Sequence, residues 1–107
     1  MNLEINDRKN RKKMKIQKII WLEVIVEKLA VKHRVRPKEV EEVLQNRPQF
    51  YFMETGNRLG EDVYMALGQT KAGRYLTILF IHKHQSQALI LSARDMAKAE
   101  RKRYGRT

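Results

Sequence analysis

The chain has 107 residues, which suits one small domain with a hydrophobic core and leaves no room for two. Lysine and arginine number 23 against 12 aspartate and glutamate residues, and the resulting net charge of +11 predicts a polyanionic partner or substrate. Because the chain has no cysteine, a disulfide framework, thiolate metal sites and cysteine nucleophiles are excluded.

The N-terminal region is polar and basic. Residues 1–15 are rich in lysine and arginine and show no periodicity that would bury one face, so we expect a disordered basic arm. Such an arm is either only solvated or adds affinity for phosphate groups. We expect a single domain over residues 16–107, which begins with a short strand over residues 16–21.

Two helices are predicted next. Apolar residues recur at i, i+3, i+4 and i+7 from Leu22, which is the spacing of one buried helix face. A second helix is expected to begin at Pro37, because proline is tolerated at the first helical position. Val35 and Val40 have the spacing of a hydrophobic staple, and Glu39 can reach back to the cap position.

From Gln49 onward the apolar period changes from 3.6 to 2, which predicts strands. The expected strands cover residues 50–53, 63–67, 75–81 and 88–93. Residues 75–81 are apolar on both faces, so they should form a central strand that is covered on both sides. Asp95 is expected to cap a final helix over residues 96–104, which ends at Gly105.

The predicted fold class is α+β. The order is a short N-terminal strand, two helices, a four-strand antiparallel meander and a C-terminal helix. The longest apolar run falls far short of the roughly 20 residues that a spanning helix needs. We therefore expect a soluble, cytoplasmic protein that makes no contact with a membrane.

Most catalytic chemistries lack the residues they need. His82 and His84 lie two apart at a strand end with no third ligand predicted near them, so we expect no metal site and no cofactor. Ser86 and Ser92 have no base placed beside them. The remaining candidates for a functional site are arginine residues with aromatic and carboxylate neighbours.

Arg94 is the leading candidate for a phosphate contact, because it follows the last strand and precedes the final helix. Arg74 begins the central strand, and Tyr64 stands on the strand before it. A sheet face bearing arginine, tyrosine and glutamate would grip an RNA backbone and shuttle a proton. The alternatives are a basic last helix that is only solvated and a Tyr64 that belongs to the core. Charge alone favours nucleic-acid contact over catalysis.

Five segments in fixed order and spacing carry a family resemblance: residues 32–35, 60–68, 73–76, 90–94 and 100–104. The last two segments read apolar-apolar-Ser-Ala-Arg and then a helix with Glu-Arg and a tyrosine. Together they resemble the BrnT-type toxins of type II toxin–antitoxin systems, a family similar in fold to the RelE-like ribonucleases. The resemblance covers about residues 16–104.

The resemblance implies a metal-independent ribonuclease that inhibits translation and uses the RNA's own 2′-OH as nucleophile. Arg94 and Arg74 would clamp the phosphate and stabilise the charge of the transition state. The general base or acid would come from Glu61, Tyr64, His33 or Glu100. RNA binding would involve Lys32, Lys98, Arg101 and Tyr104, of which Arg101 and Tyr104 would otherwise only pack the last helix. The implied partners are RNA and a BrnA-like ribbon–helix–helix antitoxin, with operator DNA reached only through the antitoxin.

The sequence departs from the family pattern at two places. Asp62-Val63 stands where relatives often have Glu-Arg, and Gln69 stands where an arginine is frequent. Two cations are therefore missing from the expected sheet surface, so that either activity is reduced or the basic arm compensates. Two alternatives follow: a non-catalytic nucleic-acid-binding domain, and a degenerate toxin that acts through antitoxin-dependent operator binding.

Overall fold

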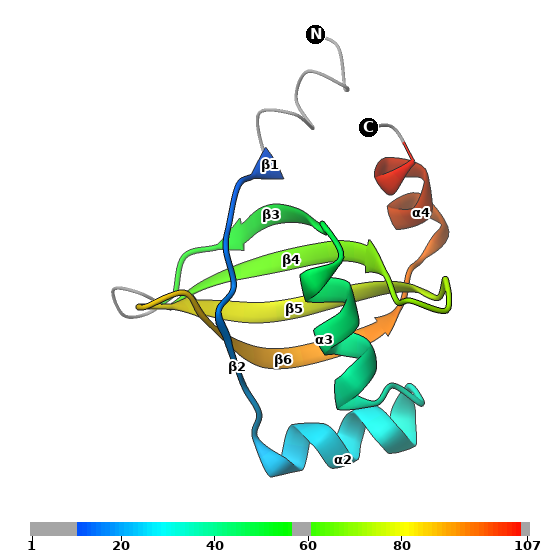
Figure 1. The fold of residues 1–107 in the computed structure, drawn as a ribbon, viewed down its shortest axis with the longest axis horizontal. Helices are drawn as coiled ribbons and strands as arrows, with labels where there is room; N and C mark the ends of the chain where they lie inside the picture. The colour runs from blue at the N-terminus through cyan, green and yellow to red at the C-terminus, as the bar shows by residue number, and fades with distance from the viewer. Residues whose placement is uncertain (1–10, 57–60, 106–107) are drawn as a thin grey trace, which may run out of the picture.

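The computed structural model describes residues 11–56 and 61–105, which form one six-stranded sheet with helices on both of its faces (Figure 1). The elements in chain order are β1 (Arg11–Lys12), β2 (Lys18–Ile20), α2 (Glu23–Lys32), α3 (Pro37–Gln45), β3 (Gln49–Glu54), β4 (Asp62–Gln69), β5 (Tyr75–Lys83), β6 (Gln87–Asp95) and α4 (Lys98–Tyr104). The strands lie in the order β1-β3-β4-β5-β6-β2. The predicted α+β class is confirmed.

The four-strand meander is antiparallel throughout, as predicted, and the two N-terminal strands flank it. β3 pairs with β4, β4 with β5 and β5 with β6. β1 pairs antiparallel with β3, whereas β2 runs parallel to β6 at the opposite edge. The sheet is therefore mixed, and both edges of the meander are covered by short strands, which limits unpaired backbone groups.

The segment between β1 and β2 crosses the face of the sheet that also carries α3 (Figure 1). The structure differs here from the expected arm over residues 1–15, because residues 11 and 12 already pair with β3. Met14 and Ile16 are partly buried and pack on the core, while Lys13 and Lys15 are exposed. This period of two is too short to stand out among basic residues. Residues 1–10 of the expected arm lie outside the described residues.

The main core lies between the sheet and helices α2 and α3. Phe80, Leu76 and Ile78 of β5 are fully buried on this face. The staple of α3 forms as predicted, since Val35 and Val40 are both fully buried. The side chain of Glu39 also accepts a hydrogen bond from the Arg36 backbone N–H, at 3.0 Å. Burying an aliphatic side chain such as that of Val35 or Val40 contributes roughly 1.5–3 kcal/mol to the stability of the fold.

The opposite face of the sheet carries α4 at one end. A second cluster forms there around Tyr51, Met65 and Leu67, against which Tyr104 of α4 packs. Asp95 does not cap this helix, which corrects the prediction, because β6 continues through Asp95 and the cap position is Ala97. No helix among residues 11–56 and 61–105 is long and apolar enough to cross a membrane.

Candidate functional site

The structure divides the predicted site residues between three places. Two of them flank the same end of the sheet, where β5 begins and β6 ends: one holds Arg74 with Lys32 and His33, and the other holds Arg94 and Glu100 with the basic residues of α4. Glu61 and Tyr64 lie toward the other end of the strands.

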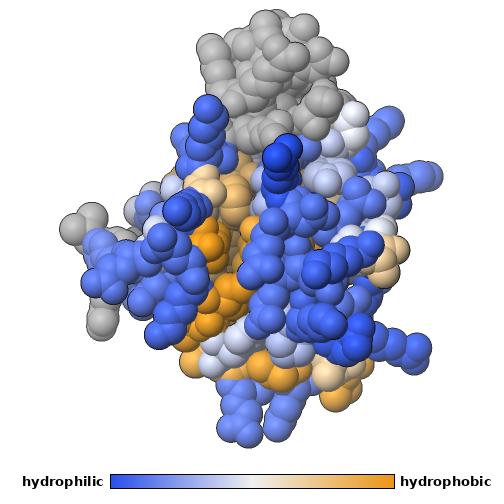
Figure 2. Space-filling view, viewed as in Figure 1, coloured by the Kyte–Doolittle hydropathy of each residue, from blue (hydrophilic) through white to orange (hydrophobic). Residues whose placement is uncertain are grey.

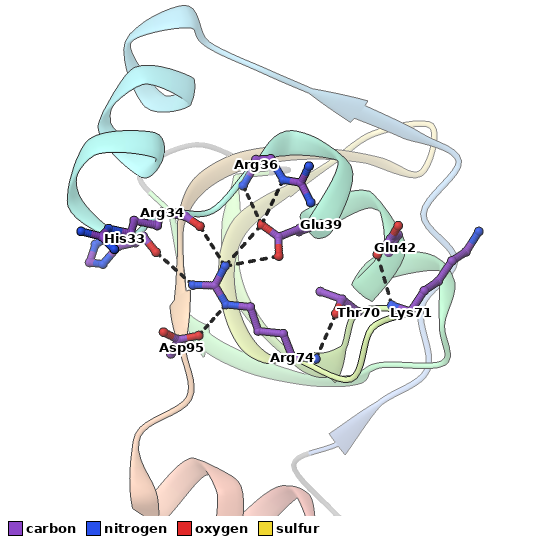
Figure 3. Close-up of polar contacts among 9 residues, drawn as sticks. All are labelled: His33, Arg34, Arg36, Glu39, Glu42, Thr70, Lys71, Arg74 and Asp95. Atoms are coloured by element: carbon purple, nitrogen blue, oxygen red, sulfur yellow. Dashed lines mark hydrogen bonds and ion pairs between the residues drawn. The ribbon is translucent and has the colours of Figure 1, made fainter.

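Arg74 joins three parts of the fold (Figure 3). Its Nε donates to Asp95 Oδ1 at 2.7 Å. Its Nη1 donates to the Arg34 carbonyl at 2.8 Å and to Glu39 at 3.3 Å, and its Nη2 donates to the His33 carbonyl at 3.0 Å. Every nitrogen of the guanidinium thus serves a protein oxygen, and the side chain cross-links the α2–α3 turn to β5 and β6.

Electrostatics favour this arrangement. The hydrogen bond from Arg74 lowers the pKa of Asp95 below its ordinary value. Burial raises the pKa of Glu39, but the hydrogen bond from the Arg36 backbone and the contacts with Arg74 outweigh burial, so the pKa lies below its ordinary value. Both carboxylates are therefore ionised at neutral pH. Arg34, whose carbonyl accepts from Arg74, adopts φ +53° in the turn between α2 and α3.

Arg94 and Glu100 form a separate ion pair on the α4 side of the sheet. Nη1 and Nη2 of Arg94 donate to the two carboxylate oxygens of Glu100 at 2.7 and 2.8 Å, which is bidentate geometry. Thr77 of β5 donates its hydroxyl to Glu100 at 2.8 Å, and the Ala97 backbone N–H donates at 2.7 Å. The Arg94 side chain is still 40% exposed.

These contacts set the charge state of Glu100. The hydrogen bond from Arg94, opposed by burial and helped by the bonds from Ala97 and Thr77, lowers the pKa of Glu100 to about 2. The hydrogen bond to Glu100 in turn raises the pKa of Arg94. A carboxylate with so low a pKa is ionised at neutral pH and is a weak proton acceptor. With one carboxylate oxygen on each Nη atom, Glu100 instead holds the Arg94 guanidinium in one orientation.

The remaining residues of α4 mainly pack or face solvent. The Arg101 guanidinium lies 3.5 Å from the centroid of the Tyr75 ring, and the Tyr75 and Tyr104 rings meet edge to face at 5.9 Å. Gln49 donates to the backbone carbonyl of Tyr104 at 3.0 Å. These contacts attach α4 to the sheet, which is the packing role that sequence reasoning left open for Arg101 and Tyr104. Lys98 is exposed.

Lys32 and His33 end α2 at the same end of the sheet as Arg74. Lys32 is the exposed last residue of the helix and His33 is its C-cap. The contact between His33 and Arg74 uses the backbone carbonyl of His33. The imidazole lies near Asp95, whose pKa its charge helps to lower.

Glu61 and Tyr64 do not join Arg94. Glu61 pairs with Lys83 at 3.7 Å, and the Tyr64 ring stacks on Phe80 and meets the His82 ring in a T-shaped contact. Tyr64 is paired with Phe80 and Arg94 with Thr77, three residues apart along β5. Side chains three positions apart on a strand point to opposite faces, so Tyr64 and Arg94 face away from one another.

Thr77 and Glu39 were not predicted as site residues. Thr77 is the one polar residue in the apolar run of residues 75–81, and that interruption was a usable signal. Glu39 was recognised only for the helix start, although it also accepts from Arg74. No group of three or more histidine, aspartate or glutamate side chains within the described ranges is arranged to hold a metal ion.

Comparisons with known proteins identify the family. The family model described as the ribonuclease toxin BrnT of type II toxin–antitoxin systems matches residues 21–100. A crystal structure of the Brucella abortus ribonuclease toxin BrnT has the same fold, with a TM-score of 0.53 and 20% sequence identity, covering 80% of this chain and 100% of that one. No curated protein matches significantly. Since the family model spans most of its length, the chain belongs to the BrnT family of ribonuclease toxins of type II toxin–antitoxin systems.

Proposed function

We propose that the chain is a metal-independent endoribonuclease that inhibits translation by cleaving RNA, with Arg94 as the residue that contacts the scissile phosphate. One observation carries the assignment of Arg94: its guanidinium is anchored in bidentate geometry by Glu100 while 40% of the side chain stays exposed. An arginine that is fixed in place and reachable from solvent is suited to bind a phosphate without further ordering.

The proposed reaction needs no group that the chain lacks. The RNA 2′-oxygen attacks the adjacent phosphorus and loses its proton to water, while the bond from phosphorus to the 5′-oxygen breaks and that oxygen takes up a proton. The products are a 2′,3′-cyclic phosphate and a 5′-hydroxyl end. Negative charge develops on the non-bridging oxygens, and a positioned guanidinium stabilises that charge more than it stabilises the ground state.

The other predicted residues receive different roles. Glu100 is ionised with a pKa of about 2, so we assign it to positioning Arg94 and not to proton transfer. Arg74 serves protein oxygens with all three of its guanidinium nitrogens, and its side chain is 27% exposed against 40% for Arg94, so we assign it to holding the sheet end together. Lys32 and Lys98 are exposed at this end and would attract the RNA backbone. Glu61 and Tyr64 face elsewhere and receive no catalytic role.

The test is incubation of the full chain with single-stranded RNA in EDTA, followed by mapping of the product ends. Arg94→Ala should lower the cleavage rate about 100-fold or more, the usual loss for one donor to developing charge. The matched control is Lys28→Ala, which removes one positive charge from an exposed position on α2. Urea unfolding of both variants shows that they are folded. Unchanged cleavage by folded Arg94→Ala would overturn the assignment.

A non-catalytic nucleic-acid-binding protein is the alternative, and the +11 net charge favours it. This alternative is supported if the chain cuts neither free RNA nor RNA on translating ribosomes, yet binds RNA with an affinity that falls steeply as the salt concentration rises. As a toxin, the chain is proposed to act with a BrnA-like ribbon–helix–helix antitoxin and to reach operator DNA through it. A chain that binds the antitoxin and operator without cutting RNA would be the degenerate toxin.

A further inference from the structure

A groove of about 550 Å³ lies on the α3 face of the sheet, the face opposite to that of Arg94. One wall is the segment that crosses the sheet between β1 and β2, and the other is the end of α3 with the residues that follow it. Figure 2 shows apolar surface beside α3, bordered by hydrophilic side chains. The lining includes Met14, Ile16, Leu44, Pro48 and Phe50.

Positive charge surrounds this apolar floor. Lys12 lines the groove from the end of β1, Lys13 and Lys15 line it from the crossing segment, and Arg47 lines it from the α3 side. The lysines are exposed, and Arg47 is also exposed. The lining contains no carboxylate among the described residues. A ligand that fits must therefore offer apolar side chains to the floor and negative charge along both sides.

We propose that this groove binds an acidic, amphipathic segment of the antitoxin. The identity of the partner rests on the proposed toxin function, whereas its chemistry follows from the groove. Two or three large apolar side chains of such a segment would fill the floor, and flanking carboxylates would meet the lysines and Arg47. Carboxylates near a rim of cations also raise the association rate and make binding sensitive to salt.

A protein segment fits this groove better than RNA does. RNA-binding surfaces that read single strands present flat, exposed aromatic rings on which bases stack. Among the described residues of the lining, the one aromatic ring is that of Phe50, which is buried, and the rest of the floor is methionine, aliphatic or proline. Aliphatic floors are instead typical of grooves that receive the apolar face of an amphipathic peptide.

The groove and the candidate site lie on opposite faces of the sheet. Phe50 and Leu44 belong to the core that α2 and α3 cover, whereas Arg94 lies beside Thr77 and α4. The antitoxin contact can therefore be disturbed without touching the residues assigned to the chemistry. This separation allows the two proposals to fail independently.

The experiment measures binding of the full chain to the BrnA-like antitoxin of the proposed function, by calorimetry at 0.1 and 0.5 M salt. Lys13→Glu with Lys15→Glu should weaken binding about 30-fold at low salt. The control pair Lys28→Glu with Lys71→Glu makes the same change in net charge at exposed positions outside the groove and should weaken binding about threefold or less. Met14→Gln, which removes apolar floor, should weaken binding about 10-fold at both salt concentrations.

Equal effects of the groove pair and the control pair would overturn the proposal. A 2′-O-methyl oligoribonucleotide, which cannot be cut, serves as the second probe. Loss of its binding in the groove pair, with antitoxin affinity unchanged, would show that the groove holds nucleic acid and would also overturn the proposal. If the wild-type chain cuts no RNA, the proposed ribonuclease function fails, yet the antitoxin measurements still decide the groove. Urea unfolding confirms that each variant is folded.

Discussion

Replacing Arg74 separates a structural from a catalytic role for this arginine. Arg74→Met keeps most of the aliphatic stem and removes the guanidinium that joins the α2–α3 turn to β5 and β6. Two backbone carbonyls, those of His33 and Arg34, would lose their donor. Glu39, which is only 14% exposed, would keep its charge and its contacts with Arg36 but would lose the guanidinium of Arg74.

The expected loss of stability can be worked from these contacts. Each carbonyl contact and the contact with Glu39 contributes about 1 kcal/mol. The pair with Asp95, a residue that is 68% exposed, contributes about 0.5 kcal/mol. We therefore expect Arg74→Met to lower the free energy of unfolding by about 3.5 kcal/mol, which corresponds to a fall in Tm of about 15 °C for a domain of this size.

Urea unfolding followed by circular dichroism measures the loss, with Arg36→Met as the matched control. Arg36 is 75% exposed and its ion pair with Glu39 is 3.7 Å long, so its loss should cost about 0.5 kcal/mol or less. RNA cleavage is then measured well below the melting temperature of the variant, where Arg74→Met should stay within about threefold of wild type. Unchanged stability, or a folded Arg74→Met that no longer cuts RNA, would refute the reasoning.

Two further predictions concern Glu100 and two glycines. Because the pKa of Glu100 is about 2, below its ordinary 4.5, its contribution to stability is complete above about pH 5 and is lost as the pH falls toward 2. Glu100→Gln should therefore lower the free energy of unfolding by about 2 kcal/mol at pH 7 and by less at pH 3, as measured by urea titrations. A Cβ at Gly68 would lie 2.9 Å from Val43 Cγ1 and 3.2 Å from Pro48 Cβ, so Gly68→Ala should cost about 2 kcal/mol. A Cβ at Gly73 meets no neighbour within 4 Å, but the residue must hold φ +93°, so Gly73→Ala should cost about 1 kcal/mol. Urea unfolding measures both variants, and a larger loss of stability in Gly73→Ala than in Gly68→Ala would contradict the packing argument.

Local signals predicted most of the fold. The start of α3 follows from Pro37, the staple of Val35 and Val40, and the backward reach of Glu39, all within six residues. The meander follows from period-two alternation between turns. The parallel pairing of β2 with β6 joins residues almost 70 positions apart, from Lys18 to Gln87, and no local pattern encodes it.

Asp95 shows how a distant contact overrides a local preference. Aspartate after a strand and before a helix is a good N-cap by propensity. In the folded chain its carboxylate accepts from Arg74, which lies 21 residues earlier, and Ala97 takes the cap position. The N–H of Ala97 is then satisfied by Glu100 from within α4.

A bulge explains why the candidate site could be predicted only in part. Simple alternation from Ala88 would place Ile90, Ser92 and Arg94 on one face, together with Tyr64 and the main core. The register of β6 against β5 shifts between Leu79 and Phe80, which are opposite Ser92 and Ile90, so Leu91 is the additional residue. Beyond the bulge the faces exchange, and Arg94 lies on the α4 side.

Because the faces exchange at the bulge, Arg94 and Asp95 are neighbours in the chain whose side chains make their contacts on opposite faces of the sheet. Asp95 lies opposite Leu76 on the side of α2 and α3, where it completes the cross-link of Arg74. Arg94 lies opposite Thr77, where Glu100 orients it. Loss of Arg74 should therefore appear first in unfolding and loss of Arg94 first in cleavage. Two arginines at one end of one sheet are thereby expected to have separable phenotypes.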